Sequence, residues 1–108
     1  MPDEQGHPSR SEMRLASVMA ALADPVRAKV VRDLATDLND TERTCASFRL
    51  EVSKSTQTHH FRVLREAGLI SQIDYGNSRK VKLRRTDLDD RFPGLLALVA
   101  AEDEPATD

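Results

Sequence analysis

Residues 53–69 read SKSTQTHHFRVLREAGL, and the predicted architecture follows from this segment. A hydroxyl such as that of Ser53 can accept a hydrogen bond from a free backbone N–H at a helix start. Gly68 suits the position just past a helix end, because glycine adopts the left-handed conformation there at little cost. The sequence therefore predicts a helix of about four turns between Ser53 and Gly68.

The predicted helix has one face suited to burial and one polar face. At about 100° per residue, the first face gathers mostly apolar side chains, with Gln57 and Phe61 at its border. This face comprises Thr56, His60, Val63, Leu64 and Ala67. The polar face comprises Lys54, Ser55, Thr58, His59, Arg62 and Arg65. Such side chains hydrogen-bond base edges and phosphates, so the polar face is either a DNA-reading surface or an ordinary solvated one.

A two-residue period replaces the helical period after Gly68. Apolar residues alternate with polar ones on both sides of residues 76–78, which read Gly-Asn-Ser, a hairpin-turn signal. Arg79 and Lys80 follow the tip of this predicted hairpin. A two-stranded ribbon alone is marginally stable, so we expect it to pack on the helices. The residues expected to make these contacts are Ile70, Ile73, Val81 and Leu83.

The N-terminal half predicts further helices. An amphipathic pattern begins at Ser11, and Asp24-Pro25 ends it and starts a second helix, Asp24 as the cap and Pro25 at the first position. The core face of the second helix comprises Val26, Val30, Val31, Leu34 and Leu38. A short helix is expected between Thr41 and Arg49. With the helix that follows Ser53 it makes a helix-turn-helix, and the basic hairpin makes the arrangement a winged helix.

The first and last helices are apolar over more than one narrow stripe. Thr86 or Asp87 can cap the last helix or pair of short helices, and Phe92-Pro93-Gly94 interrupts it. Because a small domain has few elements to cover such faces, we expect these helices to form an isologous dimer. The alternative is that they only close the core of the monomer. Their apolar residues are Met13, Leu15, Ala16, Val18, Met19 and Leu22 in the first helix, and Leu95, Leu96, Leu98 and Val99 in the last.

Charge is unevenly distributed in this chain of 108 residues and net charge −2. Residues 53–85 hold eight basic and two acidic residues, whereas the remainder holds eight basic and sixteen acidic. Polyanions are therefore attracted to one side of the molecule. No apolar run is long enough for a membrane span, and no signal peptide is visible. The single cysteine fits a reducing compartment, so we expect a cytoplasmic protein.

The sequence predicts one domain, mainly α-helical with a small β-hairpin. Residues 1–10 are expected to be a disordered tail, residues 11–101 a winged helix-turn-helix DNA-binding domain, and residues 102–108 an acidic disordered tail. His7, in the first tail, is expected to be solvated rather than a ligand.

Three segments resemble the ArsR/SmtB family of winged-helix transcriptional repressors: residues 21–27 (ALADPVR), residues 53–70 and the hairpin at Gly76. The resemblance covers roughly residues 13–100, and residues 58–70 are its most specific part. It implies a homodimer that occupies operator DNA and leaves it when an effector binds. It also implies that Arg79 and Lys80 lie at the wing. The residues it places at the major groove are Ser55, Gln57, Thr58, His59 and Arg62.

Many members of that family sense metals, but the usual ligands are missing from this sequence. The stretch that would carry paired thiols has only Cys45, and no histidine follows His60. His59 and His60 point about 100° apart on a helix and cannot chelate one ion together. We therefore expect neither a metal nor a cofactor. Cys45 is interpreted as a small buried hydrophobe, with a redox-active or intersubunit thiol as the alternative.

The sequence as a whole predicts a sequence-specific DNA-binding transcriptional regulator, a homodimeric repressor released by a non-metal signal. An enzyme is not expected, because no motif places a catalytic set or a phosphate loop. The alternative is a winged-helix module that contacts proteins and does not bind DNA. The predicted contacts to double-stranded DNA are Lys54, Ser55, Gln57, Thr58, His59, Arg62, Arg65, Arg79 and Lys80.

Overall fold

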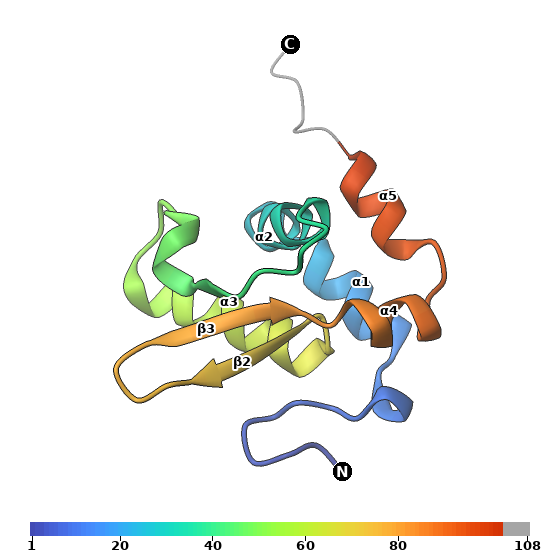
Figure 1. Ribbon diagram of the computed structural model, residues 1–108, viewed down its shortest axis with the longest axis horizontal. Helices are drawn as coiled ribbons and strands as arrows, with labels where there is room; N and C mark the ends of the chain where they lie inside the picture. Colours follow the sequence, from blue (N-terminus) through green and yellow to red (C-terminus); the bar gives the residue numbers. More distant parts are fainter. Residues whose placement is uncertain (103–108) are drawn as a thin grey trace.

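The computed structural model describes residues 1–102; the rest of the predicted acidic tail lies outside the described residues. The fold is a winged helix-turn-helix, mainly α-helical with a small antiparallel sheet, as the sequence predicts (Figure 1). In chain order the elements are η1 (Arg10–Glu12), α1 (Leu15–Leu22), α2 (Pro25–Thr36), β1 (Arg43–Thr44), η2 (Cys45–Phe48), α3 (Lys54–Ala67), β2 (Ile70–Asp74), β3 (Arg79–Leu83), α4 (Arg85–Arg91) and α5 (Leu95–Ala101). No helix among residues 1–102 has the length and apolar character needed to cross a bilayer.

Helix α2 begins as its sequence predicts, and it ends at Thr36, before Leu38, which was expected on its core face. The Asp24 carboxylate accepts hydrogen bonds from the backbone N–H groups of Val26 and Arg27, and Pro25 occupies the first position. After Thr36 the Asp37 carboxylate accepts the N–H groups of two later residues, which turns the chain out of the helix. The placement of Leu38 on the core face is therefore wrong: this side chain is 84% exposed.

The segment between Thr41 and Arg49 differs from the single short helix expected there. A two-residue strand, β1, pairs antiparallel with β3, and the four-residue 3-10 helix η2 follows it. The hairpin thereby becomes a three-stranded sheet of order β1-β3-β2. Phe48 on η2 is buried, and its ring centroid lies 5.7 Å from that of Phe61 on α3. This contact joins the two helices of the helix-turn-helix.

The hairpin has the predicted strands and turn. Ile70 pairs with Leu83 and Asp74 with Arg79 across the ladder. Gly76 in the turn has φ of 86°, a conformation that glycine adopts readily. Of the four side chains expected to hold the hairpin on the helices, Ile73 is only half-buried. The other three, Ile70, Val81 and Leu83, are buried.

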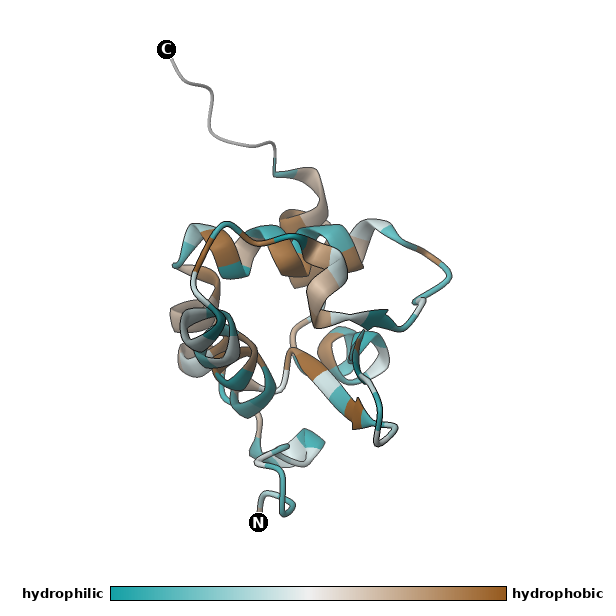
Figure 2. Ribbon diagram, turned by 90° about the vertical axis from the view of Figure 1, so that its left-hand side faces the viewer, coloured by the Kyte–Doolittle hydropathy of each residue, from teal (hydrophilic) through white to brown (hydrophobic). Residues whose placement is uncertain are grey.

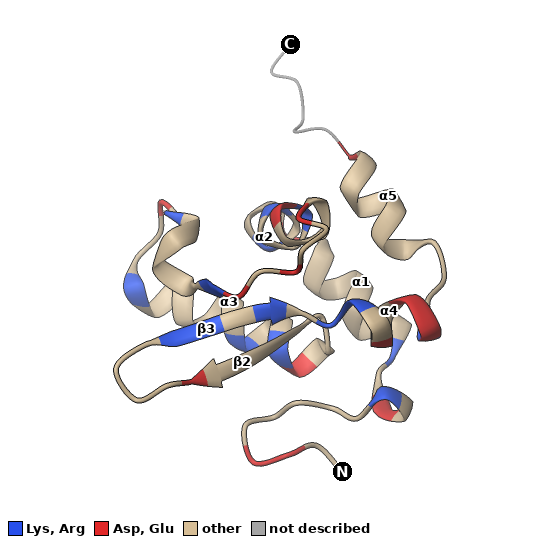
Figure 3. Cartoon of the chain, viewed as in Figure 1, with Lys and Arg blue, Asp and Glu red and all other residues tan. Residues whose placement is uncertain are grey.

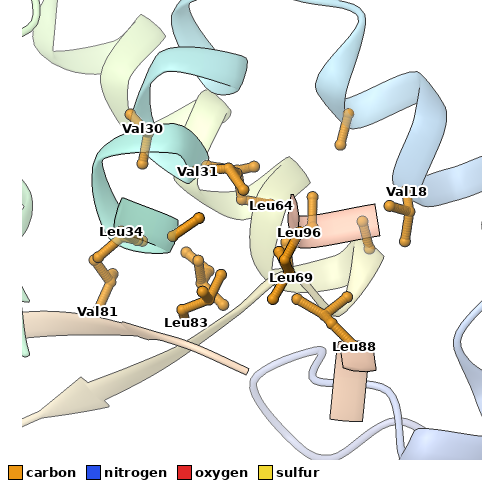
Figure 4. Close-up of a cluster of buried hydrophobic side chains, with 14 of the residues drawn as sticks. Val18, Val30, Val31, Leu34, Leu64, Leu69, Val81, Leu83, Leu88 and Leu96 are labelled. Carbon is orange, nitrogen blue, oxygen red and sulfur yellow. The ribbon is translucent and has the colours of Figure 1, made fainter. Parts of the chain in front are cut away.

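The core lies where α1, α2, α3, the sheet and the C-terminal helices meet. Figure 2 shows hydrophobic stretches where these elements face one another, and Figure 4 shows side chains from all of them converging. Gly68 borders this core with φ of 91°, and a Cβ there would lie 2.8 Å from a side-chain carbon of buried Met13. The end of α3 therefore requires glycine for both its conformation and its space.

The C-terminal part forms two short helices separated at residues 92–94, as predicted. The predicted caps are wrong, because α4 begins after Arg84 and neither Thr86 nor Asp87 caps it. The Asp87 carboxylate instead accepts hydrogen bonds from the side chains of Arg10 and Arg84. Helix α5 packs against α2 and contributes Leu96 to the core.

The sequence predicts a disordered tail for the N-terminal segment, residues 1–10, and in the structure this segment contacts the wing. It runs beside β2 (Figure 1). The N–H of Gln72 donates to Nε2 of His7, and the Arg84 side chain donates to the carbonyl of Pro8. Pro8 is buried, and the first regular helix, α1, begins at Leu15 rather than at Ser11. These contacts involve backbone atoms, so no pattern of side chains in the sequence indicates them.

Candidate nucleic-acid interface

Helix α3 has the two ends that its sequence predicts. The Ser53 hydroxyl accepts the N–H of Thr56 at 3.2 Å, and Gly68 ends the helix in the left-handed conformation. Three assignments to its buried face are corrected, one of them Val63, which is only half-buried. Thr56 is exposed, because it lies in the capped first turn, and Phe61 is only 3% exposed rather than bordering the face. The buried side chains of α3 are His60, Phe61, Leu64 and Ala67.

The outer face of α3 carries the side chains expected to read DNA. Two of the predicted DNA contacts on this helix, Gln57 and Arg65, are half-buried, and the others are exposed. Lysine and arginine donate to phosphates and base edges, and the hydroxyls and imidazole both donate and accept. Figure 3 shows basic residues along α3 and β3, and acidic residues on α4 and in the N-terminal segment. The exposed members of the face are Lys54, Ser55, Thr58, His59 and Arg62.

Arg62 is held loosely by neighbours on its own helix. One terminal nitrogen of its guanidinium lies 3.2 Å from Nδ1 of His59, and Nε lies 3.6 Å from the Glu66 carboxylate. Arg62 and Glu66 are both more than half exposed, and exposed pairs of this kind contribute little to stability. The guanidinium can therefore exchange these partners for a base edge or a phosphate at small cost.

The two histidines at the centre of α3 face different environments, as predicted. His59 is exposed, whereas His60 is 7% exposed. Nδ1 of His60 lies 3.1 Å from a terminal nitrogen of Arg27, whose Nε donates to the carbonyl of Ala21. The Arg27 side chain thus links the end of α1 to the buried face of α3.

The wing presents two further cations near its tip. Arg79 is exposed, and its Nε lies 3.8 Å from the carboxylate of Asp74, its cross-strand partner. Lys80 is half-buried, with its ammonium 5.7 Å from the centre of the Tyr75 ring. Tyr75 donates its hydroxyl to the carboxylate of Glu42.

A hollow of about 290 Å³ separates α3 from the wing and gathers six of the nine predicted DNA contacts. Ser55, His59 and Lys80 lie outside its lining. Four cationic side chains on one concave surface favour a polyanionic partner. The lining comprises Cys45, Lys54, Gln57, Thr58, Phe61, Arg62, Arg65, Gln72 and Arg79.

Arg65 is the most restrained of the predicted contacts. Its Nε donates to the backbone carbonyl of Gln5 at 2.6 Å, and Nη1 donates to the side-chain oxygen of Gln72 at 2.8 Å. Both acceptors are neutral, so the positive charge of Arg65 is retained at the hollow. Gln5 and Gln72 could not be predicted as partners of Arg65, since nothing local to either residue in the sequence indicates a contact with α3.

Arg49 is a further exposed cation near α3, and it is not among the predicted DNA contacts. It lies in the turn between η2 and α3 with φ of 50°, and its side chain is exposed. Its position in the sequence could have indicated a DNA contact, because the turn of a helix-turn-helix precedes the helix start that faces DNA.

Cys45 lies at the hollow with its thiol half-buried and unpaired. Burial raises the pKa of the Cys45 thiol, against the opposing effect of Arg79 and Arg65. A raised pKa lowers the thiolate fraction and the reactivity of the side chain. Among residues 1–102, no three histidine, cysteine, aspartate or glutamate side chains gather as metal ligands.

Comparisons with known proteins place this arrangement among bacterial regulators. The family model for bacterial regulatory proteins of the arsR family matches residues 24–72, from α2 into β2. The chain is also 30% identical over 83 residues to an uncharacterized HTH-type transcriptional regulator, YceK, of Bacillus subtilis (strain 168). That alignment covers 75% of this chain and 81% of the relative.

Proposed function

This chain belongs to the ArsR family of bacterial regulatory proteins, and from that premise we propose that it is a homodimeric repressor of transcription. Membership makes it a DNA-binding transcriptional regulator and not an enzyme. We assign the DNA-binding domain to residues 11–101. We place the protein in the cytoplasm, where a regulator of bacterial transcription meets its DNA.

The observation that carries the proposal is the cationic hollow between α3 and the wing. It joins residues from one helix and one hairpin into a single surface suited to the sugar-phosphate backbone. We assign Lys54, Arg65 and Lys80 to phosphates, together with Arg79 at the wing tip. Contacts of this kind make affinity depend strongly on salt concentration.

Sequence discrimination is assigned to the exposed middle of α3. A good bidentate contact to a base is worth about 1–3 kcal/mol of discrimination. Arg62 is the strongest candidate for one, because its guanidinium is exposed and its present partners are weak. The Thr58 hydroxyl donates to the carbonyl of Lys54, which leaves its lone pairs as acceptors toward the groove. Gln57, Thr58 and His59 supply the remaining base contacts.

The terminal helices support the proposed dimer. Leu15 and Met19 on α1 are 47% and 59% exposed, and Leu98 on α5 is 72% exposed. A largely apolar hollow of about 240 Å³, lined by Leu22, Leu98 and residues of α2, lies between α1 and α5. A second copy covers such faces most simply when the same patch is used on both subunits. Two-fold symmetry also matches paired half-sites on DNA.

We propose that a non-metal signal releases the repressor from DNA. The support is the set of ligand types in the chain: one cysteine and no histidine after His60. Such a set suits neither paired thiolate coordination nor a histidine-rich site on the last helix. Cys45 is retained as a redox-responsive candidate, although its raised pKa makes it a slow nucleophile.

Sequencing of random DNA selected by the purified protein tests the proposed function. We expect enrichment of a palindrome whose half-site centres lie about one helical turn apart, because a symmetric dimer presents two α3 helices. Enrichment of a single half-site would contradict the dimer. Recovery of unselected sequence, with no retention of DNA at low salt, would contradict the function and favour the protein-binding alternative.

A further inference from the structure

Residues 3–8, here called the N-terminal strap, lie along β2, the edge strand of the wing. The sheet order β1-β3-β2 leaves β2 at the edge, with outward backbone groups that have no strand partner. The strap satisfies one of them, because the N–H of Gln72 donates to Nε2 of His7 at 2.9 Å. It is therefore attached to the wing through a specific contact.

The strap is shaped to present His7 in this way. The Asp3 carboxylate accepts the N–H groups of Gln5 and His7, and also lies 2.9 Å from Nδ1 of His7. A ring with a carboxylate at Nδ1 and an N–H at Nε2 fits the neutral tautomer that carries its proton on Nδ1. Gly6, with φ of 88°, lets the strap pass close to α3, since a Cβ there would lie 3.3 Å from a side-chain carbon of Glu66.

The strap also holds a cation of the proposed DNA surface. The carbonyl of Gln5 accepts from Nε of Arg65 at 2.6 Å, and the same guanidinium faces the hollow. The guanidinium is a charged donor in both cases, but a phosphate is also a charged acceptor and can accept two parallel N–H groups, whereas the Gln5 carbonyl is neutral and accepts one. A phosphate in the hollow can therefore displace Gln5 from Arg65.

We propose that the N-terminal strap is an autoinhibitory element that competes with the DNA backbone for Arg65. The inference rests on the proposed function and adds its regulation. In the free protein the strap is bound to Gln72 and Arg65, and its Asp3 and Glu4 add negative charge beside the basic face. DNA takes over Arg65 and releases the strap. Because the two events are linked, releasing the strap by other means strengthens DNA binding.

Point variants of the full chain test the inference with a labelled random-sequence duplex at about 50 mM salt. His7→Ala removes the acceptor for Gln72, and Gly6→Ala strains the strap against Glu66 without removing a hydrogen-bonding group. Both should bind the duplex about three- to tenfold more tightly than the wild type, the range that one lost hydrogen bond predicts. If both substitutions raise the affinity for the duplex, the effect cannot be specific to loss of the imidazole, because Gly6→Ala keeps it.

Two matched variants separate attachment from charge. His7→Gln keeps a side-chain acceptor in the strap and should bind like the wild type. Glu4→Gln removes one negative charge and leaves every contact of the strap in place, so its gain should be smaller than that of His7→Ala. A gain in Glu4→Gln that equals the gain in His7→Ala would overturn the proposal, because the strap would then act through its negative charge and not through competition for Arg65.

Hydrogen exchange measures the strap directly. Addition of the duplex to the wild type should speed exchange of the amide of Gln72, which His7 protects in the free protein. Unchanged or slower exchange at Gln72, or unchanged or weaker affinity in both His7→Ala and Gly6→Ala, would overturn the strap while leaving DNA binding intact. Failure of every protein, the wild type included, to bind the duplex would overturn the proposed function together with the strap.

Discussion

Helices α3 and α5 are both exposed on one side, but the side chains they expose have opposite character. Helix α3 buries four side chains and turns lysine, hydroxyls, imidazole and arginine outward. Helix α5 reads LLALVAA, buries Leu96 and leaves Leu98 72% exposed. Contact with another protein's apolar surface yields little free energy for a polar face, whereas an apolar face is stabilised by any apolar surface that buries it. This contrast supports the proposal that one chain has two partners, DNA at α3 and a second copy at α5.

The largest expected effect concerns the inner side of α3. Leu64 is fully buried, so Leu64→Ala should lower the free energy of unfolding by about 2–5 kcal/mol, through lost transfer energy and a residual cavity. Urea unfolding followed by circular dichroism measures it. Leu38→Ala is the matched control, because the same atoms are removed from a side chain that is 84% exposed. Equal losses in the two variants would deny that α3 is anchored by its inner face.

The next effect concerns the apolar side of α5. In an isologous dimer Leu98→Glu introduces a charge twice, so we expect the dimer dissociation constant to rise about a hundredfold or more. Sedimentation equilibrium measures it. Leu38→Glu adds the same charge at another exposed leucine and should leave the dimer unchanged. A Leu98→Glu protein that sediments as the wild type does would remove α5 from the interface.

A smaller effect concerns the outer side of α3. Arg62→Ala should weaken binding to the selected operator by about 1–3 kcal/mol and binding to random DNA by less. Titrations of both duplexes at one salt concentration measure the difference. Lys29→Ala, which removes an exposed cation from α2, controls for the loss of charge. If Arg62→Ala loses equally on both duplexes, Arg62 contacts phosphate rather than a base.

The smallest expected effect is a loss of stability at acid pH, and it should arise from carboxylates outside α3 and α5. The N-terminal amino group and then the N–H of Ser9 hydrogen-bond Glu12 and lower its pKa to about 2. Hydrogen bonds from Arg10 and then Arg84 lower the pKa of Asp87, against the opposing effect of burial. Folded pKa values below the unfolded ones stabilise the protein above about pH 5, and this contribution is lost as pH falls toward 2.

Denaturant titrations across that range test the pH prediction. The double variant Glu12→Gln, Asp87→Asn should lose less stability between pH 5 and pH 2 than the wild type, although it starts from a lower value. If the free energy of unfolding falls equally with pH in the two proteins, other carboxylates cause the acid sensitivity.

Features fixed by neighbours in the sequence were predictable. Ser53 and Gly68 define both ends of α3, and Asp24-Pro25 defines the start of α2, because caps act on backbone groups within a few residues. The Gly-Asn turn likewise defines the hairpin. The family match and the YceK relative support the regulator that these motifs indicate.

Features fixed by distant contacts were not predictable. Strand β1 exists because Arg43 and Thr44 pair with β3, far along the chain. Leu38 fits a helical stripe, yet the Asp37 carboxylate turns the chain before it. The contact between Arg65 and Gln5 uses a backbone carbonyl, which every residue carries. Such contacts depend on the assembled fold and leave no local signature.

Affinity for a random-sequence duplex, measured across a series of salt concentrations for the wild type and for Arg79→Ala, tests whether α3 and the wing bind DNA. We expect the wild type to bind at about 50 mM salt, and the logarithm of its binding constant to fall linearly with the logarithm of salt concentration. The slope for Arg79→Ala should be shallower by about one for each Arg79 side chain removed. Absence of binding at low salt would contradict the assignment of α3 and the wing to DNA. Identical slopes for the two proteins would contradict the role of the wing.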